Sequence, residues 1–139
     1  MKITTKGRYA LRATLALAGL GTNGEPVSIN CLSRHESISP VFLEQIFFRL
    51  RKAGIVASVR GPGGGFYFAK TPDKITLKDI LKASGENLGT DICEKHIESC
   101  SRIERCLSHA VWERADALLN NFFEAITLAE ILKGDWEGK

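Results

Sequence analysis

The chain has 139 residues, of which 44% are hydrophobic and 25% charged, and its net charge is +3. This apolar fraction predicts a folded core in one domain, or in one small domain with an appendage. No apolar run is long enough to cross a bilayer, because the most apolar stretch, from Ala10 to Leu20, is short and interrupted by Arg12.

The beginning of the chain lacks the small-residue cleavage site of a signal peptide. We therefore expect a cytoplasmic protein with no membrane partner. In that compartment the four cysteines are expected to be metal ligands or free thiols rather than disulfides.

Charge is distributed unevenly along the sequence. Up to Lys74 there are 11 Lys and Arg against 4 Asp and Glu, a net charge of +7, whereas the remainder has a net charge of −4. A basic half favours a polyanionic partner, and the acidic half is expected to face protein or solvent.

Residues from Lys2 to Leu20 have the apolar spacing of a helix that ends near Gly19 and Gly21. Three cations, Lys6, Arg8 and Arg12, lie near its beginning. Cations there do not complement the helix dipole, so they are either solvated or meet an anion.

Two helices are predicted next. Ser28 is expected to cap a short helix from Ile29 to Glu36, in which Cys31 is interpreted as a small packed side chain rather than a metal ligand. Ser39 and Pro40 are the N-cap and first residue of a second helix that stops at Gly54. Its inward stripe consists of Leu43, Ile46, Phe47 and Leu50.

A glycine-rich hairpin follows. A β-prone segment from Val56 to Arg60 and the aromatic run Phe66-Tyr67-Phe68 flank the tip Gly61-Pro62-Gly63-Gly64-Gly65. A nucleotide phosphate loop is excluded because such loops open a helix, whereas this tip runs into a strand. A flexible hairpin without a partner remains the alternative.

The order of these elements indicates DNA binding. Two helices joined by a tight turn and followed by a basic wing place the second helix in the major groove. Gln45 is suited to adenine, Glu44 to the amino group of cytosine, and Arg60 to guanine or to a narrow minor groove. An ordinary solvated helix face is the alternative that this agreement disfavours.

Thr76 and Asp79 predict a capping box for a helix from Leu77 to Ser84, stopped by Gly85. Apolar periodicity is then lost between Glu86 and Arg105. Three thiols and an imidazole lie in or just after this stretch: Cys93, Cys100, Cys106 and His109.

Soft thiolates and an imidazole on a loop without its own core suit a metal or an iron–sulfur cluster. Zinc and an iron–sulfur cluster fit equally well, and His96 offers a further pairing with Cys93. A metal-free thiol switch ranks third, with Lys95, Arg102 and Arg105 as cations that would lower a thiol pKa.

Apolar periodicity resumes at Leu107 and continues to Ile126, which predicts a helix of roughly twenty residues. Its apolar width suggests burial against a second copy of the chain, although it could also cover its own domain. Thr127 and Glu130 predict a capping box for a last helix from Leu128 to Lys133, ended by Gly134.

Four segments, residues 2–10, 42–56, 58–66 and 106–112, resemble the IscR-type iron–sulfur cluster transcription regulators, of the superfamily that includes NsrR and CymR. The resemblance covers nearly the whole chain. It implies a dimeric winged helix-turn-helix protein with a [2Fe–2S] cluster held by Cys93, Cys100, Cys106 and His109; [4Fe–4S] and zinc are the alternatives.

The resemblance also implies contacts to a near-palindromic, double-stranded DNA operator. The expected contact residues are Lys6, Arg8, Tyr9, Ser39, Val41, Phe42, Glu44, Gln45, Arg49, Arg60, Gly61, Pro62, Gly63 and Gly64. The chain departs from the IscR pattern by one extra residue between the first two cysteines and by Val41 in place of a polar residue. NsrR-type members use an acidic residue near the N-terminus as the fourth cluster ligand. Position 8 of this chain is Arg8, which favours the IscR type.

The predicted fold class is mainly α with a small β wing: a winged helix-turn-helix DNA-binding domain over residues 1–85 plus a long dimerisation helix. Residues 86–106 are the expected cluster-binding loop and residues 103–134 the dimerisation helices.

The predicted function is a regulator that senses cluster status or redox and nitrosative stress, and controls iron–sulfur biogenesis or stress genes. An iron–sulfur electron carrier is the less favoured alternative, and no catalytic constellation predicts an enzyme.

Overall fold

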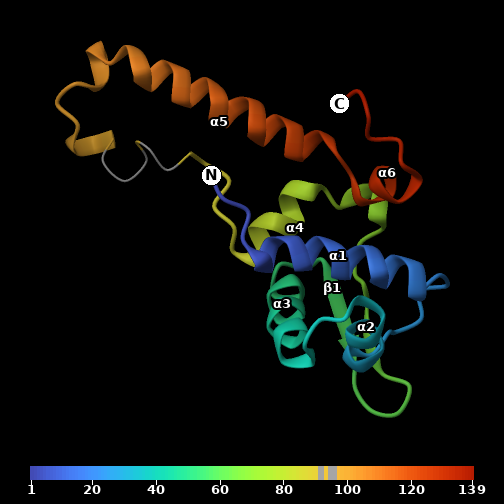
Figure 1. The fold of residues 1–139 in the computed structure, drawn as a ribbon. Helices are drawn as coiled ribbons and strands as arrows, with labels where there is room; N and C mark the ends of the chain where they lie inside the picture. Colours follow the sequence, from blue (N-terminus) through green and yellow to red (C-terminus); the bar gives the residue numbers. More distant parts are fainter. Residues whose placement is uncertain (91–92, 94–96) are drawn as a thin grey trace.

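Helices dominate the computed structural model, which describes residues 1–90, 93 and 97–139 (Figure 1). In chain order the α-helices are α1 (Thr5–Leu20), α2 (Ile29–Glu36), α3 (Pro40–Lys52), α4 (Leu77–Ser84), α5 (Leu107–Ala125) and α6 (Leu128–Lys133). The described residues also form the short 3-10 helices η1 (Pro72–Lys74), η2 (Ile97–Ser99) and η3 (Ile103–Arg105). The strands β1 (Val56–Val59) and β2 (Gly65–Phe68) form an antiparallel pair.

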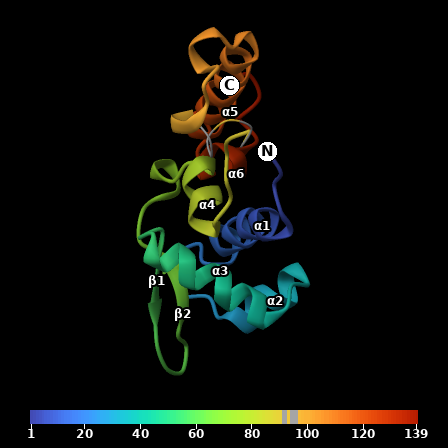
Figure 2. The same ribbon diagram turned by 90° about the vertical axis from the view of Figure 1, so that its left-hand side faces the viewer.

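The predicted architecture is confirmed: α2 and α3 pack against α1, and the two strands follow as a wing. Figure 2 shows the wing at the end of the molecule opposite to α5. The wing is fixed to the body by Val27, whose backbone exchanges hydrogen bonds of 2.8 and 2.9 Å with Phe66. A Cβ at Gly65 would collide with the Val27 carbonyl, so this close approach requires glycine.

The core beneath α3 consists of the predicted apolar stripe. Its four members are at most 1% exposed and pack with residues of α1, α2 and α4 in one cluster. Gly54 then adopts a positive φ of 74°, as expected for a glycine that ends a helix.

Both predicted capping boxes are present. Thr76 and Asp79 form one at the beginning of α4, and Thr127 and Glu130 form the other at α6. Ser28 caps α2 through the Cys31 amide at 3.1 Å. Ser39 occupies the predicted N-cap position of α3 and Pro40 its first position, although the Ser39 side chain forms no capping hydrogen bond.

Helix α1 begins at Thr5 and not at Lys2, because Thr4 has the extended backbone of an N-cap residue. The buried carboxylate of Glu86 accepts hydrogen bonds from the Thr4 amide (3.2 Å), the Gly7 amide (3.0 Å) and the Thr4 hydroxyl. An anion at a helix N-terminus satisfies free amides and complements the helix dipole. A side chain 79 residues away from Gly7 therefore sets where α1 begins.

The C-terminal helices return to the winged part of the molecule. Phe123 of α5 packs with Leu81 of α4 and with Leu88, whereas Leu128 of α6 is fully buried in the main core. The backbone of Leu77 donates to the Ile126 carbonyl, and that of Leu128 donates to the Ile75 carbonyl, both at 2.8 Å. The remainder of α5 projects away from the body (Figure 1).

Glu86 yields a prediction about stability. Although burial raises the pKa of the Glu86 carboxyl, hydrogen bonds from Thr4 and Gly7 and the charge of Lys6 outweigh this effect and hold the pKa below its ordinary value of 4.5. The stabilising contribution is therefore present above pH 4.5 and is lost as the pH falls through the lowered pKa of the folded state. We expect Glu86→Gln to lower the free energy of unfolding by about 1 to 2 kcal/mol at pH 7.

Urea unfolding at several pH values measures this effect. The difference between the parent and Glu86→Gln should shrink as the pH falls below 4.5. Glu113→Gln, an exposed position on α5, is the matched control and should have little effect at any pH. A Glu86→Gln difference that does not vary with pH would contradict the assignment.

Candidate nucleic-acid interface and cysteine loop

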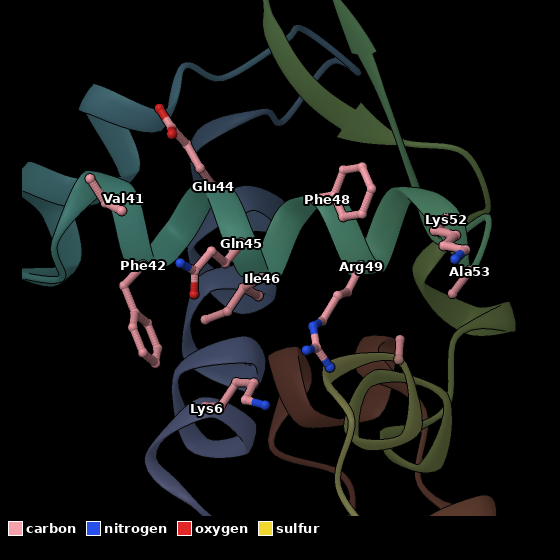
Figure 3. A pocket seen from close by; sticks show the side chains of 11 residues that line it. Lys6, Val41, Phe42, Glu44, Gln45, Ile46, Phe48, Arg49, Lys52 and Ala53 are labelled. Carbon is pink, nitrogen blue, oxygen red and sulfur yellow. The ribbon is translucent and has the colours of Figure 1, made fainter.

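The exposed face of α3 borders an open groove of about 900 Å³ (Figure 3). Its lining comes from the first turn of α1, from α3 and from the end of α4. The residues are Lys6, Val41, Phe42, Glu44, Gln45, Ile46, Phe48, Arg49, Lys52, Ala53 and Ala83. Six of the sequence-predicted DNA-contacting residues are thus brought together: Lys6, Val41, Phe42, Glu44, Gln45 and Arg49.

Two predicted contact residues pack against each other beside this groove. The rings of Tyr9 and Phe42 meet edge to face, with 5.6 Å between their centroids, and both side chains are half-buried. The guanidinium of Arg12 lies over the Tyr9 ring and pairs with Glu36 at 2.8 Å. These contacts fix α3 and α2 on α1, so Tyr9 and Phe42 orient the helix pair.

Arg49 was predicted to contact DNA, but the sequence did not indicate that it also contacts α4. Its Nη1 atom donates to the Ser84 carbonyl at 3.3 Å, at the C-terminus of α4. A cation at that position complements the helix dipole and satisfies a terminal carbonyl. Arg49 therefore joins α3 to α4 within the groove.

The wing tip is held in its turn by the backbone. Gly61 and Gly63 have φ angles of 93° and 72°, which favour glycine, and the Gly64 amide donates to the Gly61 carbonyl at 2.9 Å. A Cβ at Gly64 would collide with the Val59 carbonyl. Arg60 is exposed immediately before this turn, and Pro62 is exposed within it. The tip thus presents backbone and one cation with little side-chain bulk.

Two further predicted residues lie near the beginnings of helices. Arg8 is exposed in α1 and donates to the Thr5 hydroxyl at 3.2 Å. Ser39 is exposed at the N-cap position of α3. Both are accessible from solvent.

The cysteine loop, residues 90–106, contacts α5 at both of its ends. The Thr90 amide and hydroxyl donate to the Asp116 carboxylate at 2.7 and 3.2 Å. At the other end, Cys106 is the N-cap residue of α5, and the His109 amide donates to the Cys106 carbonyl at 3.2 Å. Asp116 was not singled out from the sequence, because a carboxylate in mid-helix carries no local signal of such a contact.

Cys106 lies in surroundings that favour its thiolate. A hydrogen bond with the Ser108 hydroxyl lowers the pKa of the thiol most, and the His109 and Ser108 amides and the charge of Arg102 lower it further against the opposing effect of burial. The two side-chain atoms, Sγ of Cys106 and Oγ of Ser108, are 3.1 Å apart. Arg102 thus lowers the thiol pKa as the sequence predicted, but by less than the hydrogen bond with Ser108 does.

The predicted ligands fit a metal group in their chemistry. Within the described residues the Nδ1 atom of His109 is buried without a hydrogen-bond partner. Such an atom is unusual in a folded protein, and a metal bound to it would satisfy its lone pair. Cys93 and Cys106 are half-buried and Cys100 is exposed. No group of three or more His, Cys, Asp or Glu side chains converges among the residues that the structure describes. Lys95 and His96 lie outside that part of the chain.

Comparisons with known proteins find similar sequences over most of the chain. The sequence profile of the Rrf2 family, described as iron-dependent transcriptional regulator, matches residues 3–134. The HTH-type transcriptional regulator IscR of Erwinia tasmaniensis is 42% identical over 132 residues, which cover 95% of this chain and 79% of that protein. For IscR of Aliivibrio salmonicida the identity is 40% over 132 residues, with coverages of 95% and 77%.

Two solved structures are also similar. T. potens IscR superposes with a TM-score of 0.75 at 33% identity, covering 96% of this chain and 88% of that one. CymR of B. subtilis, described as its global cysteine regulator, gives a TM-score of 0.78 at 28% identity, with coverages of 96% and 98%. None of the helices in the described part of the chain combines the length and apolar character needed to cross a membrane.

Proposed function

The chain belongs to the Rrf2 family of transcriptional regulators, not to a family of enzymes, and from this premise we propose that it binds a near-palindromic operator as a homodimer under the control of an iron–sulfur cluster. In this proposal residues 1–85 are the DNA-binding domain, residues 86–106 the cluster-binding loop and residues 103–134 the dimerisation helices. The genes controlled are those of iron–sulfur biogenesis or stress responses.

The observation that carries the proposal is the exposed face of α3 next to the wing. Both lie at the end of the molecule remote from α5 (Figure 2). Lys6, Arg49 and Lys52 line the groove along α3, and Arg60 is exposed at the wing. A helix enters the major groove while cations on either side meet the phosphates that flank it.

Glu44 and Gln45 are the polar residues that would contact base edges. Both are exposed on α3, and Gln45 is suited to adenine. Glu44 accepts a hydrogen bond from cytosine N4. Where no donor faces it, its negative charge repels DNA, so sequences without that cytosine are bound less tightly. Lys6, Arg8 and Arg60 position the protein on the backbone or in the flanking minor groove.

Helix α5 supports the homodimer. Leu107, Val111 and Leu118 are 90%, 61% and 53% exposed in the single chain, although their spacing makes one apolar stripe. A second copy of the same stripe would bury it across a two-fold axis, which places two α3 helices on one operator.

Cys93, Cys100, Cys106 and His109 would hold the [2Fe–2S] cluster. A bound iron–sulfur group supplies a centre whose occupancy and oxidation state respond to oxidants and to iron supply. The residues where the DNA-binding domain meets the cluster loop carry this information: Ser84 contacts α3 through Arg49, and Glu86 caps α1. Any change in how the loop is held therefore acts on both helices.

Arg60 tests the role of the wing. Loss of one phosphate contact reduces the slope of log K against log salt by about 0.9, so Arg60→Ala should reduce the slope by about 1.8 for a dimer. Fluorescence anisotropy with a duplex of about 30 base pairs, long enough for two half-sites, measures this. Lys133→Ala, a cation on α6, is the control and should leave the slope unchanged. An unaltered affinity and slope for Arg60→Ala would remove the wing from the mechanism.

Leu118 tests the dimer. Leu118→Glu places a charge on the exposed stripe, so sedimentation equilibrium should give the 15.3 kDa of one chain where the parent gives twice that mass. Leu132→Glu, at a similarly exposed position on α6, should remain dimeric. A parent protein that sediments as one chain contradicts the proposed dimer.

Cys100 tests the cofactor. Protein purified without oxygen should be red-brown and contain about two iron and two sulfide ions per chain. Cys100→Ala should be colourless and still dimeric, whereas Cys31→Ala, the cysteine outside the loop, should retain the colour.

Stoichiometric zinc in a colourless parent protein would overturn the cluster assignment in favour of zinc. Absence of both metals would favour a thiol switch, for which the lowered pKa of Cys106 is the supporting observation.

A further inference from the structure

The centre of the exposed face of α3 is apolar, although a solvated helix face is ordinarily polar there. Val41 and Phe48 are 62% and 57% exposed. At about 100° and 1.5 Å per residue, they lie roughly 20° apart around the helix and about 10.5 Å apart along it, opposite the buried stripe. Glu44 and Gln45 lie between them along the helix, one on each side of the line that joins them.

The Phe48 ring contacts Arg51, which in turn contacts the wing. The guanidinium of Arg51 lies 5.8 Å from the ring centroid, and Nη1 of Arg51 donates to the Ser58 hydroxyl of β1 at 3.2 Å. Phe48 is therefore linked to the wing through Arg51, and this contact favours one position of its ring. Figure 3 shows Phe48 and Glu44 on the side of α3 away from the N-terminal part of α1.

The occupant that suits this face is duplex DNA. The first 74 residues, which include α3, have a net charge of +7, and Lys6, Arg49 and Lys52 border the groove. The C5-methyl group of thymine is the apolar group that base pairs present in the major groove. At 3.4 Å per base pair, a separation of about 10.5 Å corresponds to roughly three base-pair steps.

We propose that Val41 and Phe48 read the methyl groups of two thymines about three base-pair steps apart in each half-site, on either side of the bases contacted by Glu44 and Gln45. This inference rests on the proposed function, because it requires α3 to occupy the major groove. It assigns specificity to two side chains that have no hydrogen-bonding groups.

The experiment begins with selection of bound duplexes from a random-sequence thymine-containing pool by the intact chain. The selected half-sites should contain thymines about three steps apart. Uracil lacks only the methyl group of thymine, so duplexes are then made with a single uracil at either position. Each replacement should weaken binding roughly fourfold, as expected for one buried methyl group.

Two variants assign each methyl group to a side chain. Val41→Ser should remove the effect of uracil at one position and retain it at the other, and Phe48→Ser should do the reverse. Leu132→Ser, an exposed apolar residue of α6, is the matched control and should retain both effects. Circular dichroism and the thermal midpoint establish that the variants fold, which is expected because both side chains are exposed.

Three outcomes overturn the inference. Selected duplexes whose affinity is unchanged by uracil would show that no methyl group is read. A uracil effect that persists in both variants would assign the methyl groups to other side chains. A Phe48→Ser variant that loses self-association while it keeps the uracil effect would place the ring at a protein interface. Failure of the parent chain to select any duplex would instead overturn the proposed function itself.

Discussion

The carboxylate of Glu86 is the constraint on which the arrangement of the helices depends. It caps α1 through two backbone amides, and two residues earlier the Ser84 carbonyl accepts from Arg49 of α3. One short segment, from the last residue of α4 to Glu86, therefore contacts both the beginning of the first helix and the exposed face of the third. A Cβ at Gly7 would lie 2.7 Å from Cγ of Glu86, so the approach of α1 to this segment also depends on a missing side chain. Because the cysteine loop follows directly, these contacts are the route by which the proposed cluster would act on the DNA-reading surface.

Local chemistry explains which elements were predictable from the sequence. The capping boxes at Thr76 and Thr127 and the buried stripe of α3 depend on residues three to seven positions apart, and all are present. The beginning of α1 was predicted wrongly because its cap comes from Glu86, far away in the chain. Likewise, Arg49 was expected only as a DNA contact, since nothing near it in sequence indicates the Ser84 carbonyl. Contacts between distant segments depend on the packed fold, which periodicity does not encode.

The two ends of α5 have different roles. Towards its C-terminus, Leu119 and Phe123 pack with Leu81 and Leu88, which ties the helix to α4. Towards its N-terminus, its apolar side chains lie open to solvent next to the cysteine loop. The sequence predicted the helix and its apolar width, but spacing alone does not distinguish the half that packs within the chain from the half that would need a partner. The predicted ligands are a similar case: their residue types were evident from the sequence, but no group of three of them converges among the residues that the structure describes.

The paired backbone hydrogen bonds at Ile126 and Leu128 have a mechanical consequence. They hold the C-terminal end of α5 to Ile75 and Leu77, on either side of Thr76. This end is therefore the fulcrum about which α5 would tilt relative to the winged body. Nineteen residues at about 1.5 Å each give an arm of roughly 28 Å, so a tilt of about 5° at the fulcrum displaces the far end by about 2.5 Å. Cys106, the N-cap residue of α5, lies at that far end, where the displacement is greatest. In the proposed regulator, shifts of bond-length scale around Cys106 would in this way become small rotations of the body that carries α3.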